Sequence, residues 1–262
     1  MTATAKPQSA IVSKEEWLRA RQDLLAQEKA LSRQHDAVAA ARRALPWVRI
    51  EKEYVFETAD GKKKLAELFD GRSQLIVRHF MLGPDWKEGC VGCSFASDHV
   101  GGALAHLQNH DVTYVAVSRA PLQQIESFRK RMGWVFPWVS SLTSDFNFDF
   151  HVSFTKEDLA RGEVLYNYRM TPVSIEELSG LSVFYKDEDG GIFHTYSTYA
   201  RGDEGGVTTY FYLDLTPKGR AETGRGNLGD WVRHHDKYDA GGYVDPNGRF
   251  HDNCKQGDCR ER

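Results

Sequence analysis

The segment SQLIVRHFMLGPDWKEGCVGCSF, residues 73–95, decides the fold of this chain. It opens with a nearly continuous apolar run rich in Leu, Ile, Val and Phe, which is typical of a buried central strand. A loop of Gly, Pro and charged residues follows. Cys90 and Cys93 come next, and the small and apolar residues over 90–109 favour a helix. The segment therefore predicts a strand, a loop and a helix that begins at a pair of cysteines.

Two cysteines at this junction suit redox chemistry. The first turn of a helix offers unpaired N–H groups and a partial positive charge, which together stabilise a thiolate. We expect Cys90, at the helix start, to be reachable and to act as the nucleophile, with Cys93 one turn later as the resolving thiol. On the approach loop, the charge of Lys87 favours a thiolate and Trp86 is a candidate wall of the site.

Two other interpretations of the pair stay open. A zinc site would need two more ligands, for which His251, Cys254 and Cys259 are the candidates, although their spacing is irregular. In the second, Cys90 and Cys93 are inert buried residues. The strand–loop–helix context favours the redox interpretation, so we expect neither a metal nor another cofactor.

The rest of the middle region supplies the other layers of an α/β fold. Residues 112–118 predict a second buried strand, and Pro121 and Gly133 mark the start and end of the next helix. Two alternating strands then flank Asp189-Gly190-Gly191, the pattern of a hairpin. Strands and helices that alternate before a closing hairpin predict a central mixed sheet flanked by helices, with parallel inner strands and an antiparallel edge.

A long helix precedes this region. Ser13 and Glu16 have the spacing of a capping box, and no Gly or Pro interrupts the chain from residue 15 to 44. Apolar residues recur every seven positions along it: Trp17, Leu24, Leu31, Val38 and Leu45, with Leu18 and Leu25 alongside. We favour a helix that lies across its own domain, and the alternative is the seam of a homodimer.

Composition and charge narrow the function classes. Of the 262 residues 40% are hydrophobic and 27% charged, which suits a protein with a buried core. The formal net charge of −3 provides no general basic field for a nucleic acid. The sequence has neither the apolar run of a signal peptide nor a membrane-crossing stretch. We therefore expect a cytoplasmic protein without nucleic-acid or membrane partners.

The combined motifs resemble one bacterial family. HFMLGPDW, GCVGCSFASDH, LSVFYKDEDGGIFHTYSTYARG and LDLTPKGRAE are similar to a domain-of-unknown-function family described as predicted dithiol-disulfide oxidoreductases of the thioredoxin/peroxiredoxin superfamily. The resemblance implies a thioredoxin-like domain over 47–216, between a tail and long helix over 1–46 and an irregular extension with a mobile tail over 217–262. It also implies an oxidised thiol, disulfide or protein as substrate and a separate reductant of unknown identity.

This sequence departs from better-known relatives at three points. Gly89, rather than the Trp of thioredoxins, precedes the first cysteine, and the stretch SGLSVFY lacks the proline that thioredoxins place opposite the dithiol. Lys87 stands where peroxiredoxins have Thr or Ser, and Pro84 is one residue too close to Cys90. Peroxidase chemistry is therefore the weaker alternative.

Further residues are weighed against the thioredoxin pattern. Thioredoxins keep a buried proton acceptor near the second cysteine, a position for which His79 is the candidate. His99, under two turns along the helix from Cys93, is a second possible neighbour. The hairpin end at Arg201 should lie away from the cysteines, so we expect that residue in a structural ion pair. His234 and the residue after it would point about 100° apart on a helix and could not easily share a metal.

Overall fold

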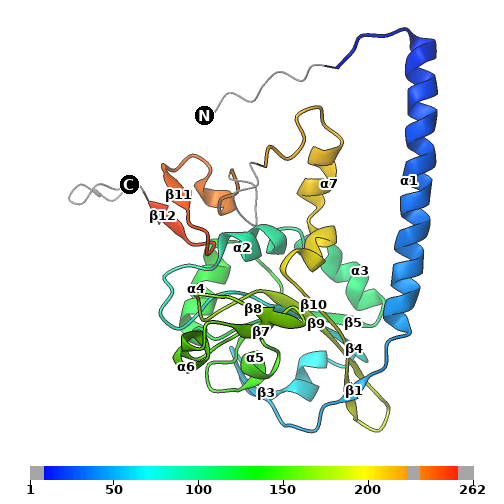
Figure 1. Cartoon of the computed structure of the whole chain (residues 1–262). Coiled ribbons are helices and arrows are strands. Elements are labelled where there is room, and N and C mark those ends of the chain that lie inside the picture. The colour runs from blue at the N-terminus through cyan, green and yellow to red at the C-terminus, as the bar shows by residue number, and fades with distance from the viewer. Residues whose placement is uncertain (1–8, 223–230, 253–262) are drawn as a thin grey trace.

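The computed structural model describes residues 9–222 and 231–252, and its centre is an eight-stranded sheet (Figure 1). The strands of this sheet are β1 (Val48–Arg49), β2 (Val55–Thr58), β3 (Gly61–Lys64), β4 (Gln74–His79), β5 (Val112–Ser118), β6 (Trp138–Ser140), β9 (Gly180–Lys186) and β10 (Ile192–Tyr199). Their order across the sheet is β1-β10-β9-β4-β5-β6-β2-β3. Two separate hairpins are formed by β7 (Val164–Tyr166) with β8 (Arg169–Thr171) and by β11 (Gly242–Val244) with β12 (Phe250–Asp252).

The helices differ greatly in length. They are α1 (Lys14–Arg43), α2 (Val91–Ser97), α3 (Leu104–Asn109), α4 (Leu122–Arg131), α5 (Phe146–Asp149), α6 (Lys156–Ala160) and α7 (Thr208–Asp214). Four 3-10 helices are η1 (Leu65–Phe69), η2 (Gly101–Ala103), η3 (Ala200–Gly206) and η4 (His235–Lys237). The helix expected over 90–109 is broken into α2, η2 and α3, because the break falls at Gly101-Gly102 and glycine weakens a helix interior.

The connections of the inner strands define a thioredoxin-like fold. β4 pairs in parallel with β5, and β5 pairs in parallel with β6. On the other side of β4, β9 pairs antiparallel, and β10 pairs antiparallel with β9. The dithiol helix α2 begins the crossover from β4 to β5. The α/β class with parallel inner strands and an antiparallel edge, predicted from the sequence, is confirmed.

The two faces of the sheet carry different cores. On one face, residues of β5, β6 and α4 pack with the two cysteines, and partly buried residues of β4 and α3 join them. On the other face, η1 and α5 contribute Phe69, Phe146 and further aromatic and aliphatic side chains. Because successive residues of a strand point to opposite faces, neighbours on β4 enter different cores.

Helix α1 has the predicted start but not the predicted position. Ser13 and Glu16 form the capping box in full. None of the residues of α1 is buried against the described part of the chain, and the helix stands beside the sheet domain rather than across it (Figure 1). The preferred interpretation of its apolar stripe is therefore wrong, since Trp17 and Leu31 are each 58% exposed.

The C-terminal extension is more ordered than the sequence suggests. Val232, Val244 and Phe250 pack against residues of α2 in a small apolar cluster. Lys237 and Arg131 both form ion pairs with Glu88, which ties the extension and α4 to the loop before the dithiol. Residues 231–252 therefore belong to the surroundings of the cysteines. Cys254 and Cys259 lie outside the described residues.

Candidate functional site: a dithiol in a small cavity

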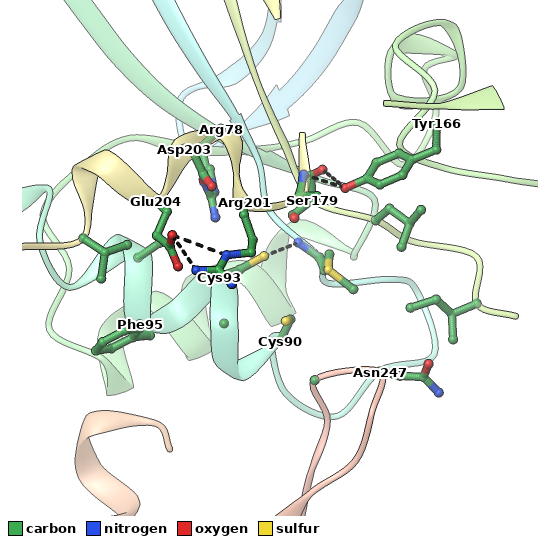
Figure 2. A pocket seen from close by; sticks show the side chains of 18 of the residues that line it. Arg78, Cys90, Cys93, Phe95, Tyr166, Ser179, Arg201, Asp203, Glu204 and Asn247 are labelled. Carbon is green, nitrogen blue, oxygen red and sulfur yellow. Dashed lines mark hydrogen bonds and ion pairs between the residues drawn. The ribbon is translucent and has the colours of Figure 1, made fainter. Parts of the chain in front are cut away.

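Cys90 and Cys93 line a cavity of about 190 Å³ (Figure 2). Its walls come from five parts of the chain: β4 with α2, β7, the segment leading into β9, η3 with the start of α7, and the turn between β11 and β12. Much of the lining is apolar, including Ile175, Leu178 and Val207. Both cysteines are reduced, and they are 5% and 2% exposed, respectively.

Cys90 is the N-cap residue of α2. Its backbone N–H donates to the carbonyl of Met81 at 2.9 Å, which fixes the helix start against the end of β4. Gly248, at the tip of the β11–β12 hairpin, lies directly over its sulfur: a Cβ built on Gly248 would be 2.6 Å from Cys90 Sγ. The Gly248 carbonyl also accepts the N–H of Val91 at 2.8 Å. The first amide of α2 is therefore already occupied.

Cys93 lies one turn later, at the sheet side of α2. Its Sγ accepts a hydrogen bond from the backbone N–H of Met81 at 3.5 Å, drawn as a dashed line in Figure 2. Hydrogen bonding from the Cys90 thiol, together with the charge of Arg78 and the Met81 N–H, lowers the pKa of Cys93 to about 6. The same thiol–thiol contact and burial raise the pKa of Cys90 well above its ordinary value. The pair therefore holds one proton and one negative charge near neutral pH.

Arg78 brings a positive charge to the Cys93 sulfur. This residue projects from β4 into the cavity, is 6% exposed and forms an ion pair with Asp203 of η3. Its Nε has no hydrogen-bond partner among the described residues. A buried guanidinium whose donors are not all used can hold an anion at the adjoining sulfur.

The opposite wall contains a residue that the sequence places elsewhere. Arg201 lines the same cavity as the cysteines, although we expected this strand end to lie away from them. The expected ion pair is present, because Arg201 bonds Glu204 at 2.9 Å. The error has a topological cause: the chain turns into η3 immediately after β10 and returns over the end of β4.

Tyr166 and Ser179 complete this wall. The Tyr166 hydroxyl donates to the Ser179 carbonyl at 2.8 Å and accepts the N–H of Ala200 at 3.0 Å. Ser179 immediately precedes β9, the place where thioredoxins carry their proline. The backbone carbonyl at this place is thus hydrogen-bonded to the Tyr166 side chain of the same chain.

Of the two residues predicted on the loop before the cysteines, only Trp86 packs near the dithiol. Trp86 is buried in the same core as the cysteines, and the Arg249 guanidinium lies 4.3 Å from the centre of its ring. Lys87 is exposed and does not line the cavity. Only glycine fits at position 89, directly before the dithiol, because a Cβ there would lie 2.5 Å from the Phe80 ring.

The two predicted histidines lie away from the sulfurs. His79 is on the other face of β4, where it stacks on Phe146 and Phe150 and shares a 2.8 Å hydrogen bond with Ser182. Burial lowers the pKa of His79 to about 3, so the ring is neutral. His99 lies past the end of α2 and bonds the Thr208 hydroxyl at 2.7 Å. The fold brings neither residue to the dithiol.

In the part of the chain that the structure describes, no three His, Cys, Asp or Glu side chains gather as a metal site. His234 bonds the Gly89 carbonyl at 2.9 Å, whereas His235 bonds Asp98 at 2.8 Å, so the two rings serve different partners. His251 bonds Asp245. Over the same described ranges, no helix combines the length and apolar character needed to cross a membrane.

Sequence reasoning missed much of the site. A charged residue inside the apolar run of β4 was the available signal for Arg78, since arginine is rarely buried without a role. Asp203, Tyr166 and Gly248 carried no such signal, because only the tertiary fold brings their segments to the cysteines.

The fold and the site together define a thioredoxin-like protein with a dithiol after the central strand. Residues 6–238 match the family model described as "Bacterial protein of unknown function (DUF899)", and the chain belongs to this family. A comparison with curated proteins gave no match.

Several solved structures are similar to this chain. Peroxidoxin BcpB from Mycobacterium tuberculosis is 11% identical, with a TM-score of 0.41 over 63% of this chain and 95% of that one. Peroxiredoxin Q from Xanthomonas campestris is 12% identical, with a TM-score of 0.39 over 64% and 96%. A PrxQ variant from Xylella fastidiosa is 14% identical, with a TM-score of 0.39 over 61% and 88%.

Proposed function

We propose that this protein is a thiol–disulfide oxidoreductase whose redox centre is the Cys90–Cys93 pair. The observation that carries the proposal is a pair of free cysteines that line one cavity with the Arg78 guanidinium. A thiolate is the reactive form of cysteine, and a second thiol close by completes the exchange. The proposal includes the cytoplasmic location expected from the sequence, where thiol pools keep such pairs reduced.

The reaction has two exchange steps. One cysteine thiolate attacks a sulfur of the substrate disulfide, a mixed disulfide forms, and one substrate thiolate leaves and takes up a proton. The second cysteine loses its proton, attacks the first and releases the other substrate thiol. The protein pair is oxidised by two electrons and the substrate is reduced to two thiols. An external dithiol reductant then restores the pair.

The test is reduction of a small disulfide, bis(2-hydroxyethyl) disulfide, with dithiothreitol as the reductant. We expect turnover by the wild-type protein and only the uncatalysed rate with Cys90→Ser/Cys93→Ser. A Cys254→Ser/Cys259→Ser variant is the matched control, since it removes the same number of thiols and leaves the Cys90–Cys93 pair in place. Equal rates for the wild-type protein and the cavity variant would refute the proposal. Hydrogen peroxide as the oxidant, with the same variants, tests the peroxidase alternative.

A second proposal concerns the partner of α1. We propose that a second copy of the chain packs antiparallel on the apolar stripe of this helix. The heptad spacing suits a partner helix of the same kind. An antiparallel copy sets the acidic first turn, with Glu15 and Glu16, beside the basic last turn, with Arg42 and Arg43. The helix, about 45 Å long by its rise per residue, otherwise leaves its six large apolar side chains 37–58% exposed.

A further inference from the structure

We infer that Cys93, rather than Cys90, is the sulfur that attacks the substrate, and that the substrate is a low-molecular-weight disulfide that enters the cavity. This inference rests on the proposed oxidoreductase function. It reverses the roles that the sequence predicts, in which the first cysteine of the pair is the nucleophile.

The groups that stabilise an anion gather around Cys93. Its sulfur receives the Met81 N–H and lies beside the Arg78 guanidinium. Cys90 Sγ lies at the start of a helix of only seven residues, where the first amide donates to the Gly248 carbonyl and the N–H groups of Gly92 and Cys93 act on the sulfur. Cys93 has in addition the full charge of a buried guanidinium beside it.

Both cysteines are almost fully buried, Cys93 (2% exposed) slightly more than Cys90 (5% exposed), but different groups cover their sulfurs. The tip of the β11–β12 hairpin sits on Cys90, with Gly248 so close that even a methyl group at its Cα would meet the sulfur. In Figure 2 this turn lies against Cys90, whereas the Cys93 sulfur points toward the side of the cavity that contains Arg201 and Ser179. A substrate in the cavity meets Cys93 without displacement of the hairpin.

The size and chemistry of the cavity select the substrate class. A volume of about 190 Å³ is below the range of about 300–1,000 Å³ that is usual for drug-sized ligands. The carbonyl of Ser179 already accepts the Tyr166 hydroxyl, so it has only one of its two acceptor positions left for a polypeptide backbone. The two arginines of the wall are each paired with a carboxylate, and apolar side chains fill much of the remainder. A small, uncharged disulfide suits this lining better than a protein disulfide.

With Cys93 as the nucleophile and Cys90 as the resolving thiol, every bond and proton of the reaction can be followed. The Cys93 thiolate attacks one sulfur of the small disulfide, forming a mixed disulfide and releasing one thiolate. That thiolate takes up the proton of Cys90 and leaves as a thiol. The Cys90 thiolate attacks Cys93 Sγ, which forms the intramolecular disulfide and releases the second thiolate, and this thiolate takes a proton from water. Dithiothreitol, a dithiol reductant, returns the pair to its starting state in the experiment below.

The experiment traps the first intermediate, because removal of the resolving thiol leaves the mixed disulfide on the nucleophile. Cys90→Ser and Cys93→Ser are each made in a full-length Cys254→Ser/Cys259→Ser background and treated with bis(2-hydroxyethyl) disulfide. Intact mass and peptide mapping then locate the adduct, and circular dichroism confirms that each variant is folded. We expect at least tenfold faster adduct formation on Cys93 of the Cys90→Ser variant than on Cys90 of the Cys93→Ser variant.

The outcomes separate this inference from the function on which it rests. An adduct that forms faster on Cys90, or equally fast on both residues, would overturn the assignment of roles but leave an active oxidoreductase. Absence of turnover in the parent protein, together with no adduct in either variant, would overturn the proposed function itself. Reduction of insulin disulfides at a rate comparable with that of the small disulfide would overturn the substrate class.

Discussion

Arg78 is one of the groups that favour a negative charge on Cys93. It is the buried cation beside Cys93 Sγ, and its own ion pair with Asp203 holds it in the cavity. A charge in a site that excludes water acts more strongly than the same charge at the surface. Lys87, which the sequence suggested for this role, is exposed at the surface.

We predict that Arg78→Met raises the pH at which Cys93 becomes reactive. The midpoint of its iodoacetamide alkylation, expected near the pKa of about 6, should move up by at least roughly one unit, with about a tenfold slower reaction at pH 6. Peptide mapping after a timed reaction at several pH values measures this midpoint. Lys87→Met is the control and should leave it unchanged. An unshifted midpoint in Arg78→Met would show that the guanidinium does not stabilise this thiolate.

His79 has a structural effect with its own pH dependence. Burial holds its pKa at about 3 in the folded protein, below the ordinary value of 6.5. Below pH 6.5 the unfolded chain binds a proton that the folded chain does not, so stability falls as the pH is lowered from 6.5 toward 3. The shift of about 3.5 units corresponds to a loss on the order of 5 kcal/mol.

We predict that His79→Gln, which does not titrate and keeps a polar partner for Ser182, flattens this part of the pH dependence. Urea unfolding of the wild-type protein and the variant at pH 4.5 and 7 measures it. The wild-type protein should lose more stability between the two values than the variant, by about 2–3 kcal/mol. A parallel decrease in both proteins would contradict the prediction.

At the scale of elements, the β11–β12 hairpin, which is not part of the central sheet, packs on the start of α2. Its turn occupies the Val91 N–H and covers Cys90, while Phe250 joins the apolar cluster on α2. The hairpin is short and lies in the C-terminal extension, so its hold on α2 depends on a few contacts. A substitution at the turn should therefore change the access of reagents to Cys90 without changing the structure of the sheet.

We predict that Gly248→Ala displaces this turn and increases the alkylation of Cys90 severalfold. Gly248 has φ of +79°, and the added Cβ would clash with Cys90 Sγ. Gly190→Ala is the matched control, because Gly190 has φ of +83° but open space around the added Cβ. Alkylation at pH 9, quantified by peptide mapping, gives the rates. The hairpin is not a cover for Cys90 if both variants react at the wild-type rate.

At the scale of the whole molecule, α1 is the part that the sheet domain does not use. Its apolar stripe remains exposed, although its start is capped and its ends carry complementary charges. A helix of this kind gains stability mainly from what packs on its apolar side. We therefore assign the stripe to assembly rather than to the core.

We predict that the wild-type chain has twice the monomer mass in solution and that Leu24→Glu/Leu31→Glu has the monomer mass. The two substitutions place charges in the apolar stripe, where pairing would bury them without partners. Ala26→Glu/Arg33→Glu introduces the same side chain on the opposite side of the helix and should leave the dimer intact. Light scattering coupled to size-exclusion chromatography gives the masses. A monomeric wild-type chain at micromolar concentration would exclude the antiparallel dimer.

A prediction was correct where it depended on residues close together in the sequence, and wrong where it depended on contacts between distant segments. The capping box at Ser13 and the strand at 112–118 depend on neighbours in the sequence, and both are found where expected. The position of α1 depended on which surface it meets, and the sequence does not contain that information. The same is true of Arg201, which η3 returns to the cavity.

The sequence by itself determined the element order, the α/β class, the cysteine pair at the start of α2 and the capped N-terminal helix. These follow from periodicity, turn chemistry and spacing, which act over a few residues. The tertiary structure alone decided that Arg78 and the Met81 N–H meet Cys93, that Gly248 covers Cys90 and that His79 faces away. Those facts depend on which distant segments share one cavity and on which face of β4 each side chain lies. Charge and burial act through space, so the environment of the two sulfurs is fixed only when the chain has folded.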